Sequence, residues 1–145
     1  MYFVSSSRVT GLVKVDSKGR ITIPQTMREN LGIEPGMLVA LLADSDKKEI
    51  VISPILSENA KVLELSIDMV DKPGSLAKVI DKIAEYKIDI IANRCTSITR
   101  REEGECTFII DISQSSIDAD KLKSALESID VVTQVRVKQF EVPSY

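Results

Sequence analysis

Two short β-branched runs flank a turn near the N-terminus of the chain, in the stretch Val13-Lys14-Val15-Asp16-Ser17-Lys18-Gly19-Arg20-Ile21-Thr22-Ile23-Pro24. The runs predict the two strands of a β-hairpin, and the segment between them predicts a short loop in which Gly19 takes a positive φ. Pro24 ends the second strand because it has no N–H for a strand ladder, and it suits the first turn of a helix. We therefore predict strands over 10–15 and 20–23, and a helix over 24–31 that ends at Gly32.

This segment is basic although the chain as a whole is acidic, with 19 Lys and Arg against 22 Asp and Glu. Five cations stand between residues 8 and 30 against two anions, and they are Arg8, Lys14, Lys18, Arg20 and Arg28. A locally basic surface on an acidic chain indicates an anionic partner for that face. The alternative is a charged turn that only faces solvent.

The order of residues in this region is Val15-Asp16-x-x-Gly19-Arg20-Ile21-x-Ile23-Pro24-x-x-Met27-Arg28-x-x-Leu31-Gly32-Ile33-x-x-Gly36. It resembles the AbrB/MazE/SpoVT family of swapped-hairpin DNA-binding domains over residues 9–55. The resemblance implies that two chains interleave their hairpins into one small β-barrel that binds double-stranded DNA. It also implies that the DNA contacts come from Lys14, Arg20 and Arg28, with Lys18 and Arg8 as weaker candidates.

Burial gives a separate reason to expect a homodimer. Further strands are predicted over 37–43 and 48–53, so the first domain has four short strands in about 45 residues, which is marginal for an independent core. A cluster of Pro, Ser, Glu and Asn follows at 54–59. We therefore predict a first domain over 1–55, a linker over 56–60, a second domain over 61–141 and a tail over 142–145.

The second domain shows regular apolar periodicity. Alternating and helical spacings predict, in order, a strand over 61–69, a helix over 75–86, a strand over 88–100, a hairpin turn over 101–104, a strand over 106–112, a helix over 118–129 and a strand over 131–140. This βαββαβ order indicates a ferredoxin-like domain with both helices on one face of an antiparallel sheet. The predicted fold class of the whole chain is α+β.

The motif Asp68-x-x-x-x-Pro73-Gly74-x-Leu76, followed by a helix and Ile88-Asp89-Ile90, resembles an ACT domain over about residues 61–141. Such a resemblance implies a regulatory module that binds amino acids between paired copies. In this loop Gly74 permits a close backbone approach, the N–H groups at the helix start suit a carboxylate, and Asp71 or Asp89 could accept from an ammonium group. The candidate ligand residues are Asp71, Lys72, Gly74, Ser75, Leu76, Asp89 and Ile90. The alternative is a plain strand-to-helix turn capped by Asp71 or Ser75.

The chain has no histidine and two cysteines, Cys95 and Cys106. We therefore expect no zinc site, no histidine-dependent catalytic pair and no cofactor. The cysteines are interpreted as small apolar residues, or as a disulfide if they face each other across a hairpin. The apolar run over 37–43 is far shorter than the about 20 residues of a membrane span, and no secretory signal is visible. A cytoplasmic protein without a membrane partner is expected.

Together these features predict a transcriptional regulator rather than an enzyme. Its partners would be DNA, an amino-acid effector and a second copy, and ACT domains could pair two dimers into a tetramer. A second interpretation is an antitoxin-like or scaffold protein whose ACT-like domain mediates oligomerisation or partner binding. A third is an enzyme or regulatory subunit of an amino-acid pathway, although no catalytic constellation is visible.

Overall fold

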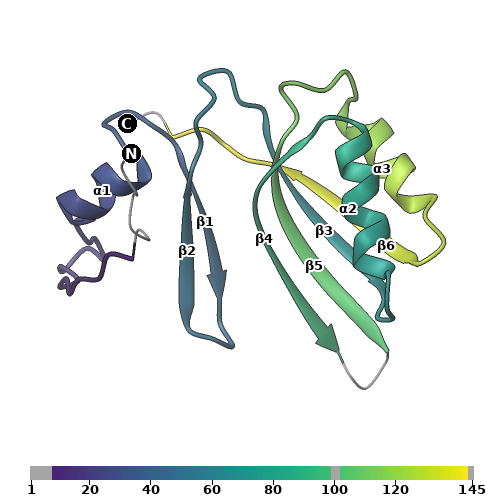
Figure 1. Ribbon diagram of the computed structural model, residues 1–145, viewed down its shortest axis with the longest axis horizontal. Coiled ribbons are helices and arrows are strands. Elements are labelled where there is room, and N and C mark those ends of the chain that lie inside the picture. The colour runs from purple at the N-terminus through teal and green to yellow at the C-terminus, as the bar shows by residue number, and fades with distance from the viewer. Residues whose placement is uncertain (1–7, 99–101, 144–145) are drawn as a thin grey trace, which may run out of the picture. The chain divides into compact units, whose positions relative to one another are not determined.

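The computed structural model describes residues 8–98 and 102–143. The chain divides into two compact units, Met1–Leu38 and Val39–Tyr145. Figure 1 shows the mixed helix and strand composition, with three helices and six strands in the described residues. The predicted α+β class is confirmed.

The first unit contains a turn and one short helix. The amide of Gly19, at φ 78°, donates to the carbonyl of Asp16 over 3.1 Å, and the amide of Asp16 donates to Arg20 over 3.0 Å. Helix α1 (Gln25–Leu31) begins after Pro24 and ends at Gly32, which adopts the left-handed conformation. The predicted helix, its glycine end and the turn are therefore present.

The predicted strands over 10–15 and 20–23 are absent from the single chain, where both segments lack a strand ladder. A two-stranded hairpin of this length has little apolar surface to bury by itself and is marginal without further strands. The β-branched pattern predicted strands here, but a ladder also needs partners that local sequence does not supply.

The second unit begins with a β-hairpin. Strands β1 (Val39–Asp44) and β2 (Glu49–Pro54) pair antiparallel, with Val39 opposite Pro54 and Asp44 opposite Glu49. The Oδ1 atom of Asp44 accepts from the amides of Asp46 and Lys47, both at 3.0 Å, and so fixes the tight turn between the strands.

A four-stranded antiparallel sheet and two helices form the rest of the unit. The elements are β3 (Val62–Val70), α2 (Ser75–Glu85), β4 (Asp89–Ile98), β5 (Glu103–Asp111), α3 (Ala119–Glu127) and β6 (Val132–Gln139), and the strand order is β4-β5-β3-β6. Both helices cover the same face of the sheet (Figure 1). This is the predicted βαββαβ arrangement. Residues 99–101, which include part of the predicted turn over 101–104, lie outside the described residues.

The hydrophobic core lies between this sheet and the two helices. Alternate residues of β3 point into it, and Leu65 and Ile67 are fully buried there beside Phe108 of β5. The helices contribute Val79 and Leu122, which are also fully buried. Full burial of one such side chain contributes about 1.5–3 kcal/mol to folding, so this sheet provides a rigid base for the loops at its ends.

The opposite face of the sheet is polar along β6. Arg136 lies 3.4 Å from Asp68 of β3 and 3.7 Å from Glu105 of β5, in an ion-pair cluster that spans three strands. These pairs are half-exposed, so they contribute little to stability. Arg136 is therefore a suitable control when other arginines of the chain are substituted.

Candidate functional site

The basic turn, which we define as residues 14–20, is organised by Asp16. Its Oδ1 atom accepts from the amides of Lys18 and Arg20, both at 2.9 Å, and its Oδ2 atom accepts from Nε of Arg20 at 2.7 Å. The amide of Arg20, and then its guanidinium, hold the pKa of Asp16 below its ordinary value. The carboxylate therefore stays ionised and fixes both the turn and the stem of Arg20.

Four of the five predicted DNA-contacting cations present their side chains to solvent. Arg8, Lys14 and Lys18 are exposed, and the Arg20 side chain is 70% exposed despite its ion pair. Arg28 differs, because it is half-buried and its Nη1 group donates to the carbonyl of Ile23. Arg28 therefore ties α1 to the segment before it.

The same unit exposes apolar side chains within the basic turn and on both sides of it. Leu12 is fully exposed, Val15 is 68% exposed and Ile21 is 48% exposed. Helix α1 has no buried residue at all. An apolar surface of this kind on a small unit is typical of an interaction surface.

A cavity of about 240 Å³ lies at the start of α2. Of the seven predicted ligand residues, the structure brings five to this cavity, which we call the loop pocket: Asp71, Lys72, Gly74, Ser75 and Leu76. Strands β4 and β5 complete its wall with residues that were not selected from the sequence, namely Cys95, Thr96, Ser97, Gly104 and Cys106.

The start of α2 lacks the side-chain cap of the alternative interpretation. Gly74 occupies the N-cap position at φ 89°, and no side chain caps the helix there, so the interpretation of Asp71 or Ser75 as a cap is wrong. Ser75 is 3% exposed, and its Oγ has no hydrogen-bond partner among the described residues. A buried hydroxyl without a partner costs about 1–3 kcal/mol, so a ligand that supplied one would gain from it.

The remaining two candidates, Asp89 and Ile90, lie at the start of β4. They line a different cavity of about 430 Å³, together with Pro54, Ser57 and Asp111. The structure therefore does not bring Asp89 and Ile90 together with the loop pocket.

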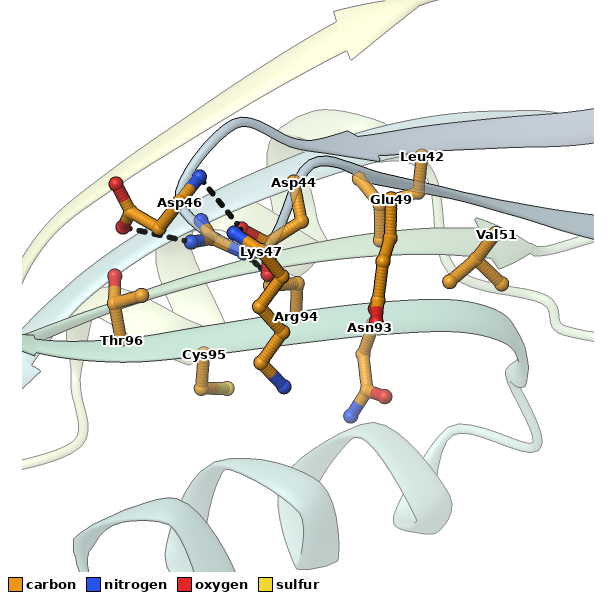
Figure 2. Close-up of a pocket in the computed structure, with 10 residues that line it drawn as sticks. All are labelled: Leu42, Asp44, Asp46, Lys47, Glu49, Val51, Asn93, Arg94, Cys95 and Thr96. Carbon is orange, nitrogen blue, oxygen red and sulfur yellow. Dashed lines mark hydrogen bonds and ion pairs between the residues drawn. The ribbon is translucent and has the colours of Figure 1, made fainter.

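An ion-pair cluster on β4 was not selected from the sequence. Arg94 pairs with Asp44 through Nε and lies 3.2 Å from Asp46 through Nη2. Figure 2 shows Arg94 pointing toward the β1–β2 turn, whereas its neighbours Asn93 and Cys95 point to the opposite face of β4, where a helix lies. The pairs link residues about fifty positions apart in the chain, a separation that no local pattern reports.

The Asp44 carboxyl group is nearly buried, with a side chain 9% exposed. The guanidinium of Arg94, and then the turn amides, hold the pKa of Asp44 below its ordinary value, and Asp44 in turn raises the pKa of Arg94. Both groups therefore stay charged over the physiological pH range. The ion pair of Arg94 with Asp44 holds the β1–β2 turn against β4.

The described residues contain neither a metal-binding cluster nor a membrane-spanning helix. Within residues 8–98 and 102–143, no cluster of three or more His, Cys, Asp or Glu side chains is arranged to hold a metal ion. No helix in that part of the chain is long and apolar enough to cross a membrane.

Comparisons with known proteins agree with both predicted resemblances. Residues 12–59 match the family described as "Antidote-toxin recognition MazE, bacterial antitoxin". The chain is 36% identical over 81 residues to a UPF0735 ACT domain-containing protein of Clostridium tetani, a match that covers 55% of the chain and 51% of that protein. The chain thus spans about half the length of this relative.

A weaker likeness exists to a solved structure, the chemotaxis kinase CheA P2 domain in complex with the response regulator CheY from Thermotoga maritima. The match has 23% identity and a TM-score of 0.42, and it covers 57% of this chain and 100% of the matched chain. Residues 12–59 are thus similar to the MazE family, and the chain is also similar to an ACT domain-containing protein, in agreement with the two resemblances in its sequence.

Proposed function

We propose that this chain is a DNA-binding transcriptional regulator whose ACT-like domain senses an amino acid. The observation that carries the proposal is the exposed basic turn within the segment that matches the MazE family. Arg8, Lys14, Lys18 and Arg20 would neutralise phosphates, and Arg20 is the candidate to reach a base edge. Arg28, held by the Ile23 carbonyl, would position α1 on the duplex.

The DNA-binding form would be a homodimer made through residues 1–55, with 56–60 as the linker to the ACT-like domain over 61–141. The support is the apolar surface of the single chain, where Leu12, Val15 and Ile21 remain exposed. The β1–β2 hairpin adds Leu41 at 60% and Ile50 at 65% exposure. A second copy that pairs with the segments at 10–15 and 20–23 would bury such side chains and complete the strand ladders.

The effector site would be the loop pocket. Asp71 could accept from an ammonium group, the backbone at Gly74 and Lys72 could hold a carboxylate, and the Ser75 hydroxyl could form the hydrogen bond that it lacks in the free protein. A free amino acid carries both an ammonium group and a carboxylate group. Pairing of ACT-like domains would then connect two dimers.

An effector changes DNA binding only if it favours one arrangement of the two domains over another. The Arg94 contacts with Asp44 and Asp46 give a physical route, since the β1–β2 hairpin lies within the MazE-type segment and β4 also forms a wall of the loop pocket. Cys95 and Thr96, the next two residues of β4, line that pocket.

Two measurements on the whole 145-residue chain test the proposal. Selection from a random duplex pool, followed by titration at several salt concentrations, should give a preferred sequence and a log-log slope near 0.9 per phosphate contacted. Thermal melts against each free amino acid should show one selective rise, because a ligand at a hundredfold excess over Kd stabilises by about 2.7 kcal/mol. Binding without sequence preference would contradict the regulator, and flat melts would contradict the sensor.

A second candidate function is that of an antitoxin, which the description of the matching family favours. In that case the chain would neutralise a toxin through a stable complex. Coexpression with the protein encoded beside it should rescue growth and yield a complex of fixed stoichiometry. If that protein is harmless to growth and does not bind, the antitoxin function is excluded for this pair.

A further inference from the structure

The two cysteines form a disulfide across neighbouring strands. Cys95 of β4 stands directly opposite Cys106 of β5, with their Cα atoms 4.1 Å apart and a bond between their sulfurs. The interpretation of both residues as unpaired apolar side chains is wrong, and the hairpin alternative is correct.

The two halves of this disulfide differ in their access to solvent. Cys106 is 3% exposed and belongs to the hydrophobic core, whereas Cys95 is exposed. Thiol–disulfide exchange depends on which sulfur an incoming thiolate can reach. Attack is therefore directed to the sulfur of Cys95, and Cys106 becomes the leaving group.

The disulfide also forms part of the wall of the loop pocket. Both cysteines line the same cavity of about 240 Å³ as Asp71, Gly74 and Ser75. The Cys95 side chain points away from the β1–β2 hairpin, to the side of the sheet where a helix lies (Figure 2). A group attached to the Cys95 sulfur would therefore compete for space in a cavity of this size with anything bound there.

We propose that Cys95 is a site of reversible S-thiolation by low-molecular-weight thiols, and that the attached group closes the loop pocket. The thiolate RS⁻ attacks Sγ of Cys95, the Cys95–Cys106 bond breaks, and its electron pair leaves on Sγ of Cys106, which takes a proton from water. A second thiolate attacks the sulfur of the attached group and releases RSSR and the Cys95 thiolate. Two thiols are thus oxidised and one protein disulfide is reduced.

Loss of effector binding is the consequence that rests on the proposed function; the modification itself depends only on the geometry of the two cysteines. The concentration of thiols around the protein would then control access to the loop pocket through Cys95. It would also affect the β1–β2 hairpin through the adjacent Arg94.

A matched pair of variants of the 145-residue chain tests the site. Cys106→Ser leaves Cys95 as the one thiol, and Cys95→Ser leaves Cys106, so both lack the disulfide and share any effect of its loss on folding. With oxidised glutathione as the probe, the remaining thiolate attacks one glutathione sulfur, forms the mixed disulfide and releases reduced glutathione. Intact-mass measurement should show the adduct forming about tenfold faster or more in Cys106→Ser. Equal rates would overturn the site assignment.

Hydrogen exchange on the Cys106→Ser protein tests closure of the pocket without knowledge of the effector. The adduct should change amide exchange in residues 72–77 and leave that in β6 unchanged. Unchanged exchange in 72–77 would overturn the proposal. If unmodified wild-type protein shows a melting shift with one amino acid, the adduct should abolish that shift, and a retained shift would also overturn the proposal. If no amino acid shifts the melting temperature, the proposed sensor function is contradicted. The rates of adduct formation and the hydrogen exchange still decide the inference about Cys95.

Discussion

The region around the basic turn and the ACT-like sheet bury their apolar residues to very different extents. Helix α1 has no buried residue, and Leu12 beside the turn is fully exposed. In the sheet, Phe108 and Leu65 are completely buried between strands and helices. Apolar residues therefore complete a core in one region and remain exposed in the other. The ACT-like region therefore has its core within one chain, and the exposed apolar residues of the first region are the reason for proposing a second copy there.

The largest effect should come from the core of the sheet. Phe108→Ala should reduce the free energy of unfolding by about 3–5 kcal/mol, because it removes a fully buried aromatic ring and leaves a cavity. Chemical denaturation followed by circular dichroism measures it. Leu56→Ala is the control, since Leu56 is 77% exposed and its loss should change stability by less than about 0.5 kcal/mol. Comparable losses in both variants would contradict the assignment of the core.

A charge placed beside the basic turn should separate the two copies. Ile21→Asp should raise the dissociation constant of the dimer by about two orders of magnitude, because an aspartate buried at an apolar interface costs a few kcal/mol. Sedimentation over a concentration series measures the change. Thr22→Asp adds the same charge one residue away and should have a much smaller effect. A wild-type chain that stays monomeric at all concentrations would contradict the proposal that a second copy buries the apolar side chains of the first region.

Arg20 and Arg136 distinguish a charge that binds DNA from one that serves the fold. Arg20→Ala should weaken binding to the selected duplex by about 1–3 kcal/mol, which corresponds to about 5- to 150-fold. Arg136→Ala removes an arginine that pairs with Asp68 and Glu105 inside the ACT-like sheet, and it should leave DNA affinity unchanged. Fluorescence anisotropy with both variants decides between them. Equal affinity of Arg20→Ala and wild type, with the dimer intact, would refute the role of Arg20.

The smallest effect concerns acid stability. Arg94 lowers the folded-state pKa of Asp44 below 3.8, so the pair stabilises the fold above about that pH, and the contribution is lost as the pH falls through the folded pKa. Arg94→Gln should therefore lower the melting temperature near neutral pH and converge with wild type in strong acid. Arg136→Gln is the control, because Arg136 forms half-exposed ion pairs on the same sheet. Parallel curves for Arg94→Gln and wild type at all pH values would exclude the linkage.

The sequence predicted the elements that depend on local periodicity. The alternation at Leu63, Leu65, Ile67 and Met69 predicted β3, and helical spacing predicted α2 and α3 within a few residues. Five predicted loop residues, Asp71, Lys72, Gly74, Ser75 and Leu76, also line one pocket. These signals are local, because a buried face repeats along one element.

The parts that the sequence did not predict depend on pairing between distant residues. The hairpin turn was expected at 101–104, yet Glu103 already pairs with Ile98, so the register that brings Cys95 opposite Cys106 was not foreseen. The Arg94 contact with Asp44 depends on how the β1–β2 hairpin packs against β4. The strand ladders expected at 10–15 and 20–23 are absent from the single chain. The sequence pattern of one segment does not report which segment lies opposite it.

One measurement tests the central claim most directly: the affinity of the wild-type chain for its selected duplex, titrated with and without the amino acid that raises its melting temperature. The account predicts that the dissociation constant changes by about fivefold or more, because typical coupling between two sites is about 1–3 kcal/mol. The loop-pocket variant Ser75→Val should lose this response while retaining the affinity for DNA that it shows without effector. Identical dissociation constants with and without the bound amino acid would contradict an effector-controlled regulator.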